Sequence, residues 1–193
     1  MVQEKTRCPW GDNAAMLQYH DEEWGRPMHD EGRLFEMLIL EGQQAGLSWA
    51  IILNKRENYR KAYDGFDPHK IALYGEEKVQ QLLGDASIIR NRLKVQAVIT
   101  NAKAYLAMLE KGTTLDAFLW GYVEGKPIVG RYERMQDMPA KTELSDKISK
   151  DMKKLGFKFI GSTIIYSYLQ AIGIVNDHIE SCFAYGECID AAK

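Results

Sequence analysis

Hydrophobic side chains recur along most of the chain at the spacing of α-helices. After Asp30, a residue type that caps helix N-termini, Leu34, Phe35 and Leu38 fall on one helical face. Alternating β-branched residues never extend beyond a few positions, and no Asn-Gly or Asp-Gly turn joins two such runs. This pattern predicts an all-α fold, built as a compact bundle of short helices.

Capping residues and helix breakers predict where the other helices begin and end. The residues expected to start helices are Ser48, Pro68 after Asp67, Thr114, Ser145 and Ser162. Two further helices are expected over 76–83 and about 91–111, on either side of a tight break at 84–87. Residues 124–144, which include two prolines, are expected to form a loop.

The length and composition fit one folded domain over 1–193. The chain is 46% hydrophobic and 27% charged, which excludes global disorder. The longest uncharged run, 159–176, contains glycines and polar residues and predicts a buried helix rather than a membrane span. No targeting segment is visible in 1–11, and three sparse cysteines fit a reducing compartment. We expect a cytoplasmic monomer with no membrane association.

The net charge of −2 argues against a polybasic tail protein and by itself gives weak support for nucleic-acid binding. The charges are nevertheless uneven, because 86–109 contains four basic residues and no acid, whereas 12–41 contains eight acids against two arginines. This distribution fits either ordinary solvated helix faces or a molecule with one basic and one acidic side.

Potential metal ligands occur near both ends of the chain. Cys8 and His20 lie near the start, and His178 and Cys182 near the end are four positions apart, which on a helix places both on one face. Thiolate and imidazole ligands suit zinc, and four of them make a closed structural site. Alternatively, the cysteines are core residues and the histidines are only hydrogen-bonded. Cys188 is a rival ligand.

Glu41 lies on the apolar face of its predicted helix, three positions after Leu38. A carboxylate there must be paired, protonated or functional, because burying a lone charge is costly. The following residues, 42–49, include two glycines, two glutamines and Trp49. They predict either a helix end paired with an arginine, or a pocket in which Glu41 binds a positive planar ring and Trp49 or Tyr19 stacks on it.

The break at 84–87 precedes three basic residues, Arg90, Arg92 and Lys94. A short turn between two helices can present backbone N–H groups to a phosphate, and the basic side chains add positive charge. The segment therefore predicts a helix–hairpin–helix element that binds DNA, or else a plain antiparallel helix pair.

In order along the chain, these motifs resemble the type I DNA-3-methyladenine glycosylases, helix–hairpin–helix enzymes of base-excision repair. The resemblance is carried by residues 8–10, 19–25, 34–37, 41–49, 55–59, 156–159 and 176–178. It implies an all-α fold with a zinc site joining the N- and C-terminal regions. It also implies an enzyme that excises 3-methyladenine hydrolytically from alkylated duplex DNA without cutting the strand.

The resemblance also implies roles for individual residues. The implied zinc ligands are Cys8, His20, His178 and Cys182. The implied base-binding residues are Glu41, which is also the catalytic candidate, with Tyr19, Trp49, Trp10 and Trp24. The candidates for contact with DNA are Gly46 and Leu47, which would fill the space left by a flipped base, together with Ser87, Arg90, Arg92 and Lys94.

The sequence departs from the family at two positions and also lacks an expected aspartate. Met16 replaces a pocket tyrosine and Ser87 replaces a hairpin glycine, so weaker stacking and a less open turn are expected. Many helix–hairpin–helix glycosylases use an aspartate after the hairpin, but 86–114 contains only one carboxylate, Glu110. This absence slightly favours an alternative function, a non-catalytic zinc-stapled module that binds damaged DNA. A hydrolase of soluble nucleosides is a second alternative, against which the basic hairpin argues.

Overall fold

The computed structural model describes residues 5–11 and 13–193. Residues 1–4, part of the segment in which no targeting signal is expected, lie outside the described residues, as does Asp12, the first acid of the acidic segment. The described part of the chain forms ten α-helices, two 3₁₀ turns and two short strands. The prediction of a compact, all-helical architecture is confirmed.

Most of the helices begin close to where the sequence pattern predicts, but the helices at 14–22 and 183–191 are not among those predicted. They are α1 (Ala14–Glu22), α2 (Glu31–Gln44), α3 (Trp49–Ala62), α4 (Pro68–Ile71), α5 (Glu76–Gly84), α6 (Arg92–Glu110), α7 (Leu115–Gly121), α8 (Glu143–Lys154), α9 (Ser162–Ala171) and α10 (Phe183–Ala191). The 3₁₀ turns are η1 (Asp64–Phe66) and η2 (Met135–Asp137).

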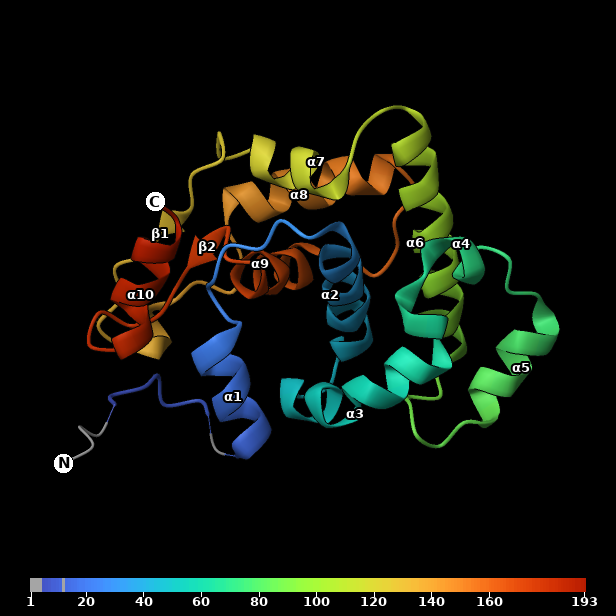
Figure 1. Cartoon of the computed structure of the whole chain (residues 1–193), viewed down its shortest axis with the longest axis horizontal. Coiled ribbons are helices and arrows are strands. Elements are labelled where there is room, and N and C mark those ends of the chain that lie inside the picture. Colours follow the sequence, from blue (N-terminus) through green and yellow to red (C-terminus); the bar gives the residue numbers. More distant parts are fainter. Residues whose placement is uncertain (1–4, 12) are drawn as a thin grey trace.

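Helix α2 forms the centre of the molecule (Figure 1). It packs against α3, α6, α7 and α9, and its residues Leu34, Phe35 and Leu38 are fully buried. The Asp30 side chain accepts a hydrogen bond from the backbone N of Arg33 and so caps the helix, as predicted. Because α2 is central, a polar residue on its buried face is held rigidly inside the fold.

Two predicted N-cap residues are wrong, Ser145 by three positions and Ser162 by one. The N-cap of α8 is Thr142 rather than Ser145, because the Thr142 hydroxyl accepts from the backbone N of Ser145 while the Ser145 hydroxyl accepts from that of Thr142. The N-cap of α9 is Gly161, and Ser162 is the first helical residue. The hydroxyls of Ser145 and Ser162 lie 2.8 Å apart, so both serines join the two helices.

A short parallel strand pair interrupts the predicted loop at 124–144. β1 (Ile128–Val129) pairs with β2 (Val175–Asn176), with Ile128 opposite Val175. Two-residue strands are too short to leave an alternating pattern in the sequence. The pairing holds the segment that leads from α9 towards His178.

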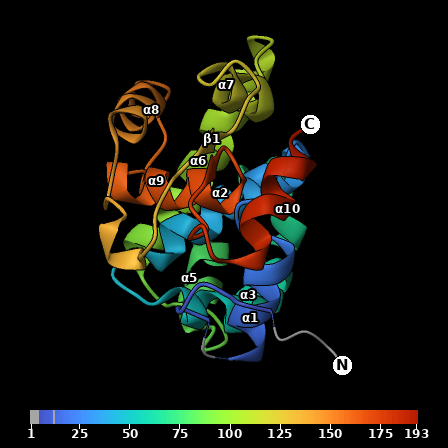
Figure 2. The same cartoon turned by 90° about the vertical axis from the view of Figure 1, so that its left-hand side faces the viewer.

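The N-terminal segment lies beside α10 in space. The backbone N of Phe183 donates to the carbonyl of Thr6 at 2.9 Å, and Figure 2 shows α1 and α10 on the same side of the molecule. The uncharged run at 159–176 forms α9 rather than a longer helix, and none of the described helices is long and apolar enough to cross a membrane.

Candidate functional site

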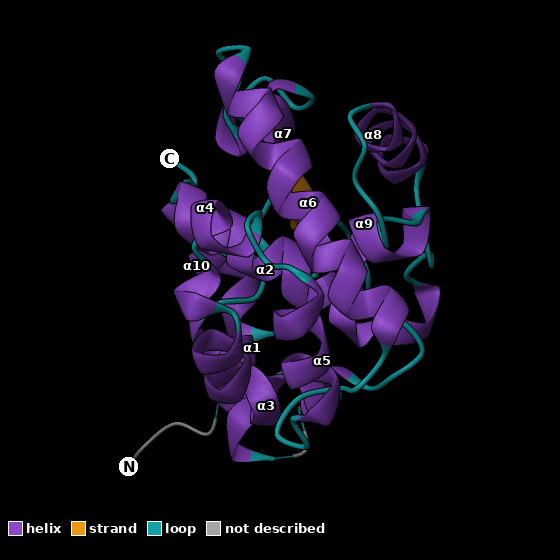
Figure 3. Ribbon diagram, turned by 90° about the vertical axis from the view of Figure 1, so that its right-hand side faces the viewer, coloured by secondary structure: helices purple, strands orange, loops and turns teal. Residues whose placement is uncertain are grey.

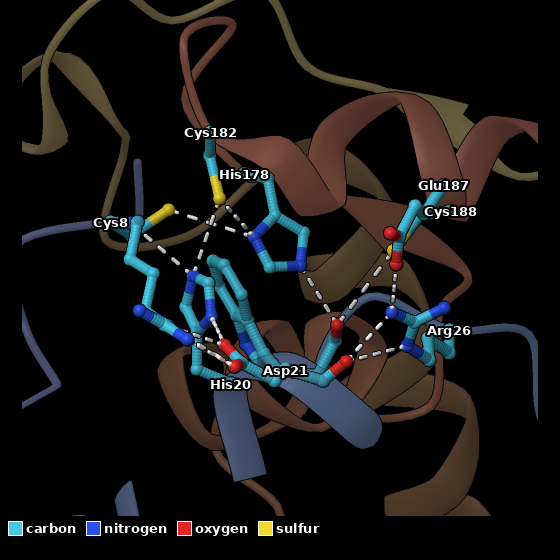
Figure 4. Close-up of polar contacts among 10 residues, drawn as sticks. Cys8, His20, Asp21, Arg26, His178, Cys182, Glu187 and Cys188 are labelled. Carbon is cyan, nitrogen blue, oxygen red and sulfur yellow. Dashed lines mark hydrogen bonds and ion pairs between the residues drawn. The ribbon is translucent and has the colours of Figure 1, made fainter. Parts of the chain in front are cut away.

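Two cysteines and two histidines from opposite ends of the chain meet in a buried cluster (Figure 4). The ligand atoms of Cys8, His20, His178 and Cys182 all lie within 4.8 Å of one another. The Cys182 Sγ is 3.4 Å from His20 Nε2 and 3.5 Å from His178 Nδ1, and the Cys8 Sγ is 3.6 Å from the same His178 nitrogen.

The backbone of the cluster differs from the prediction in one respect. His178 and Cys182 do not share a helical face, because they lie in the turn between β2 and α10, and Cys182 is the N-cap residue of α10. The turn nevertheless brings the two side chains together, with the Cys182 Sγ 3.5 Å from His178 Nδ1. Cys188 lies on α10 outside the cluster, with its Sγ 3.9 Å from the Trp24 carbonyl.

Neighbouring groups orient both histidines towards the sulfur atoms. The Nε2 of His178 donates to the Trp24 carbonyl at 2.9 Å, and the Nδ1 of His20 donates to Asp21 at 2.8 Å. Asp21 is held in turn by the Arg7 guanidinium. Each imidazole therefore points its other nitrogen at the thiols, as in metal sites whose histidines have a second hydrogen-bond partner.

The chemistry of the cluster fits a metal ion. Hydrogen bonding from Cys8, and then from His178 and His20, lowers the pKa of Cys182, which favours the thiolate form that binds metals. The described cysteines form no disulfide. Two thiols and two oriented imidazoles, all buried, could together bind one metal ion.

A cavity of about 240 Å³ lies next to the cluster, because Trp24 lines the cavity and its carbonyl accepts the hydrogen bond from His178. It brings together all six of the predicted pocket residues, together with Gln44 of the segment 42–49 that was expected to approach a ligand. The six residues are Trp10, Met16, Tyr19, Trp24, Glu41 and Trp49, and the two lining residues that the sequence analysis missed are Ser167 and Gln170.

The walls of the cavity are largely aromatic. The Tyr19 and Trp49 rings lie 5.4 Å apart at 54°, and Trp10 packs edge-on against Trp24 at 5.1 Å. Met16, at the position where the family often has a tyrosine, is buried at the cavity. The result is a slot of suitable size and chemistry for a flat heterocycle.

Glu41 places a carboxyl group in this apolar cavity. Its side chain is 3% exposed, and its Oε2 has no hydrogen-bond partner among the described residues. The alternative of a salt-bridged helix end is wrong, because Glu41 forms no ion pair among the described residues, and Arg56 of α3 pairs with Glu23 and Glu36. Burial raises the pKa of Glu41 to about 8, so the carboxyl ionises readily only when a positive ligand compensates it.

Side chains of α3 hold the turn between α5 and α6. Lys55 Nζ donates to the Ser87 carbonyl at 2.9 Å, and the backbone N of Ile89 donates to the Tyr59 hydroxyl at 3.2 Å. Asp85 accepts from the backbone N of Ser87 at 2.8 Å. Because Ser87 does not have a positive φ, its side chain fits this turn without backbone strain, although the resemblance led us to expect glycine here. Figure 3 views the side that carries α5 and α6, which pack together.

The three basic residues after this turn differ in their surroundings. Arg90 is exposed, and Arg92 is 44% exposed and pairs with Glu76 at 3.0 Å. Lys94 differs from the expected surface cation, because it is 6% exposed and its Nζ donates to the carbonyls of Gln43 and Ala45, both at 2.7 Å. Lys94 therefore satisfies the last carbonyls of α2, and its ammonium is not directed at solvent.

Gly46 and Leu47 lie in the connection between α2 and α3, beside the cavity. Gly46 is exposed with φ near +77°, and no atom lies within 4 Å of the position that a Cβ would take. The Gln44 side chain donates to the Leu47 carbonyl at 2.9 Å and so fixes this loop. Gln44 and Trp49, the residues on either side of this loop in the chain, both line the cavity.

Known proteins share both this sequence and this fold. The family described as methyladenine glycosylase matches residues 10–185. DNA-3-methyladenine glycosylase 1 of Escherichia coli is 49% identical over 180 residues, which cover 93% of this chain and 96% of that protein. DNA-3-methyladenine glycosylase of Haemophilus influenzae is 47% identical over 178 residues, covering 92% and 96% respectively.

Solved structures agree with these relatives. A crystal structure of 3-methyladenine DNA glycosylase I is 49% identical, with a TM-score of 0.91 and coverage of 92% of this chain and 98% of that chain. The Staphylococcus aureus enzyme, described with the structural basis of its 3-methyladenine recognition, is 36% identical, with a TM-score of 0.89 and coverage of 93% and 96%. This chain belongs to the methyladenine glycosylase family.

Proposed function

We propose that this chain is a DNA-3-methyladenine glycosylase that removes the methylated base from alkylated duplex DNA by hydrolysis and leaves the strand intact. The observation that carries this proposal is the buried, unpaired carboxyl group of Glu41 inside an aromatic cavity. The names of relatives 49% and 47% identical over nearly the whole chain support the same activity.

The base must leave the DNA stack to reach this cavity. Methylation at N3 makes the attached purine cationic, and the cavity suits such a base, with aromatic walls from Tyr19 and Trp49 and a carboxyl group from Glu41. As the cation enters, Glu41 releases its proton to water, and the resulting carboxylate stabilises the positive purine. Glu41 therefore recognises the base rather than acting as a strong general base.

Excision follows from the weakness of the glycosidic bond in the cationic nucleotide. A water oxygen bonds to the sugar C1′, the C1′–N9 bond breaks, its electron pair neutralises the purine, and the water proton passes to solvent. The carboxylate of the segment after the hairpin, Glu110, is exposed at the end of α6 and lies outside the cavity lining. We therefore propose a monofunctional reaction that relies on the leaving group more than on an activated nucleophile.

The proposed DNA contacts come from two neighbouring regions. The α5–α6 turn at Ser87 would serve as the hairpin of a helix–hairpin–helix element and approach a phosphate, with Arg90 and Arg92 adding charge. Gly46 and Leu47 would fill the space vacated by the flipped base. Lys94 is left out of this set because its ammonium binds α2 carbonyls.

We propose that the metal of the Cys8, His20, His178 and Cys182 cluster is zinc with a structural role. Zinc bound by four protein ligands is closed to water and would cross-link the chain ends. We further propose a single domain over 1–193 that acts as a monomer in the cytoplasm. Incubation with methylated duplex DNA tests the activity, because the alternative, a non-catalytic damaged-DNA-binding module, would bind the DNA without releasing base.

A further inference from the structure

Gln170 lines the cavity from α9, and the reaction described so far gives it no role. Its side-chain Nε2 donates to the Asp177 carboxylate at 2.7 Å. Asp177 is 1% exposed, and the Tyr166 hydroxyl donates to the same Oδ2 atom. The Gln170 side chain therefore donates a hydrogen bond to a buried acceptor through its Nε2 and also lines the cavity.

The chemistry of this contact determines which way the amide faces. A carboxylate only accepts hydrogen bonds, so the amide NH₂ of Gln170 must face Asp177 and its Oε1 must face away. That Oε1 has no hydrogen-bond partner among the residues that the structure describes, and it is not among the fully buried unsatisfied atoms. The amide carbonyl is thus the polar group that Gln170 has free for a ligand.

Asp177 cannot easily turn to release the amide. A Cβ at Gly130 would stand 2.4 Å from Asp177 Oδ1, so the carboxylate packs directly against the backbone at this position. The backbone N of Gly130 also donates to the Asn176 carbonyl at 2.9 Å, as part of the strand pair. An amide flip would place the Gln170 carbonyl against a carboxylate, which is repulsive. The orientation of Gln170 is therefore fixed before any ligand enters.

Glu41 and Gln170 project into the cavity from α2 and α9, which pack against each other (Figure 1). Both supply acceptor oxygens that can pair with hydrogen-bond donors on a ligand, while the buried Trp49 Nε1 has no partner among the described residues and offers a donor to another part of the ligand. We propose that Gln170 is a specificity-determining residue that accepts a hydrogen bond from the exocyclic amine of the extruded purine. A 6-oxo purine would present an acceptor to this acceptor and would be rejected. This inference rests on the proposed function.

The test compares two free bases that differ in the exocyclic group at C6 and in the one ring proton that accompanies the change from amino to oxo. We would titrate 3-methyladenine and its 6-oxo analogue 3-methylhypoxanthine into the wild-type protein and into Gln170→Leu, using calorimetry. The wild type should prefer the 6-amino base, and Gln170→Leu should lower this preference about tenfold, the size of one neutral hydrogen bond, mainly by weakening 3-methyladenine. If the leucine variant does not fold, Gln170→Met gives the same measurement with an unbranched side chain.

Tyr166→Phe is the matched control, because it removes the other donor to Asp177 and leaves the Gln170 bond in place. It should retain the wild-type preference. If Tyr166→Phe lost as much of the preference for the 6-amino base as Gln170→Leu, a general disturbance of the region would explain the loss in both variants. That result would overturn the proposal. An unchanged preference in folded Gln170→Leu would overturn this inference alone. Wild-type protein that binds neither base would contradict the proposed function as well.

Discussion

The Sγ atom of Cys8 lies 3.6 Å from Nδ1 of His178, although 170 positions separate the two residues in the chain. This contact joins the segment before α1 to the turn before α10. His178 also donates to the carbonyl of Trp24, and the Trp24 residue lines the cavity. Trp24 therefore connects the cluster to the cavity. A metal bound here would therefore hold the chain ends together and keep the cavity in shape.

The first prediction concerns this metal. Purified protein should contain close to one zinc per chain, and His178→Ala should lose it. Loss of the cross-link should cost on the order of 3 kcal/mol or more, which lowers the melting temperature by about 6–12 °C for a chain of this size. Metal analysis and calorimetry measure both effects.

Cys188→Ala is the control for that experiment, because Cys188 is equally buried but lies outside the cluster. It should retain its zinc. Metal-free wild-type protein of undiminished stability would contradict a structural role for the metal.

The second prediction concerns the pH dependence of stability. Burial raises the pKa of Glu41 from its ordinary 4.5 to about 8, so the folded state holds a proton that the unfolded state releases. The contribution of Glu41 to the free energy of unfolding is therefore complete below pH 4.5. It decreases as the pH rises towards 8, by up to about 1.4 kcal/mol per pH unit. Glu41→Gln should remove this fall, and urea titrations from pH 5 to 9 measure it. If the free energy of unfolding changed with pH in the same way in both proteins, the raised pKa could not belong to Glu41.

The third prediction concerns Lys94. Its buried ammonium binds two carbonyls at the end of α2, so Lys94→Met should destabilise the fold by about 2–4 kcal/mol. Arg92→Ala is the control, because the exposed pair of Arg92 with Glu76 is screened by solvent and should contribute little to stability. Chemical denaturation compares the two variants. Equal, small effects would show that Lys94 is an ordinary surface cation.

The fourth prediction concerns the proposed DNA surface. Arg90→Ala should weaken binding to all duplex sequences alike and reduce the slope of log affinity against log salt by about 1. Lys147→Ala serves as control, because α8 lies across the molecule from α5 (Figures 1 and 3). Fluorescence anisotropy at several salt concentrations measures both slopes. A loss restricted to certain sequences would argue against a phosphate contact.

The sequence allowed most of the helices to be predicted, because an apolar face and a capping residue are local features. It could not decide between Thr142 and Ser145 as the cap of α8, since both residue types cap helices and the choice depends on which hydroxyl meets which backbone N–H. The missed α9 residues, Ser167 and Gln170, are three positions apart on a mostly apolar helix, which is a signal for a polar spot that faces a site.

Lys94 illustrates why the sequence pattern can mispredict which residues are exposed. Leu93 is 67% exposed while its charged neighbour Lys94 is buried, so the local pattern of polar and apolar positions is inverted there. The tertiary structure explains this inversion, because the Lys94 ammonium binds carbonyls about fifty residues earlier in the chain. A residue whose partner is distant in sequence cannot be assigned from the spacing of its neighbours.

The release of base from alkylated DNA is the most direct measure of the proposed glycosylase activity. Methylated duplex DNA would be incubated with the wild-type protein and with Glu41→Gln, the released bases separated by chromatography, and the strands examined on a denaturing gel. We expect the wild type to release 3-methyladenine and leave the strands intact, and the variant to release much less. Tight binding of the DNA with no released base, or release that is equal in both proteins, would contradict this expectation.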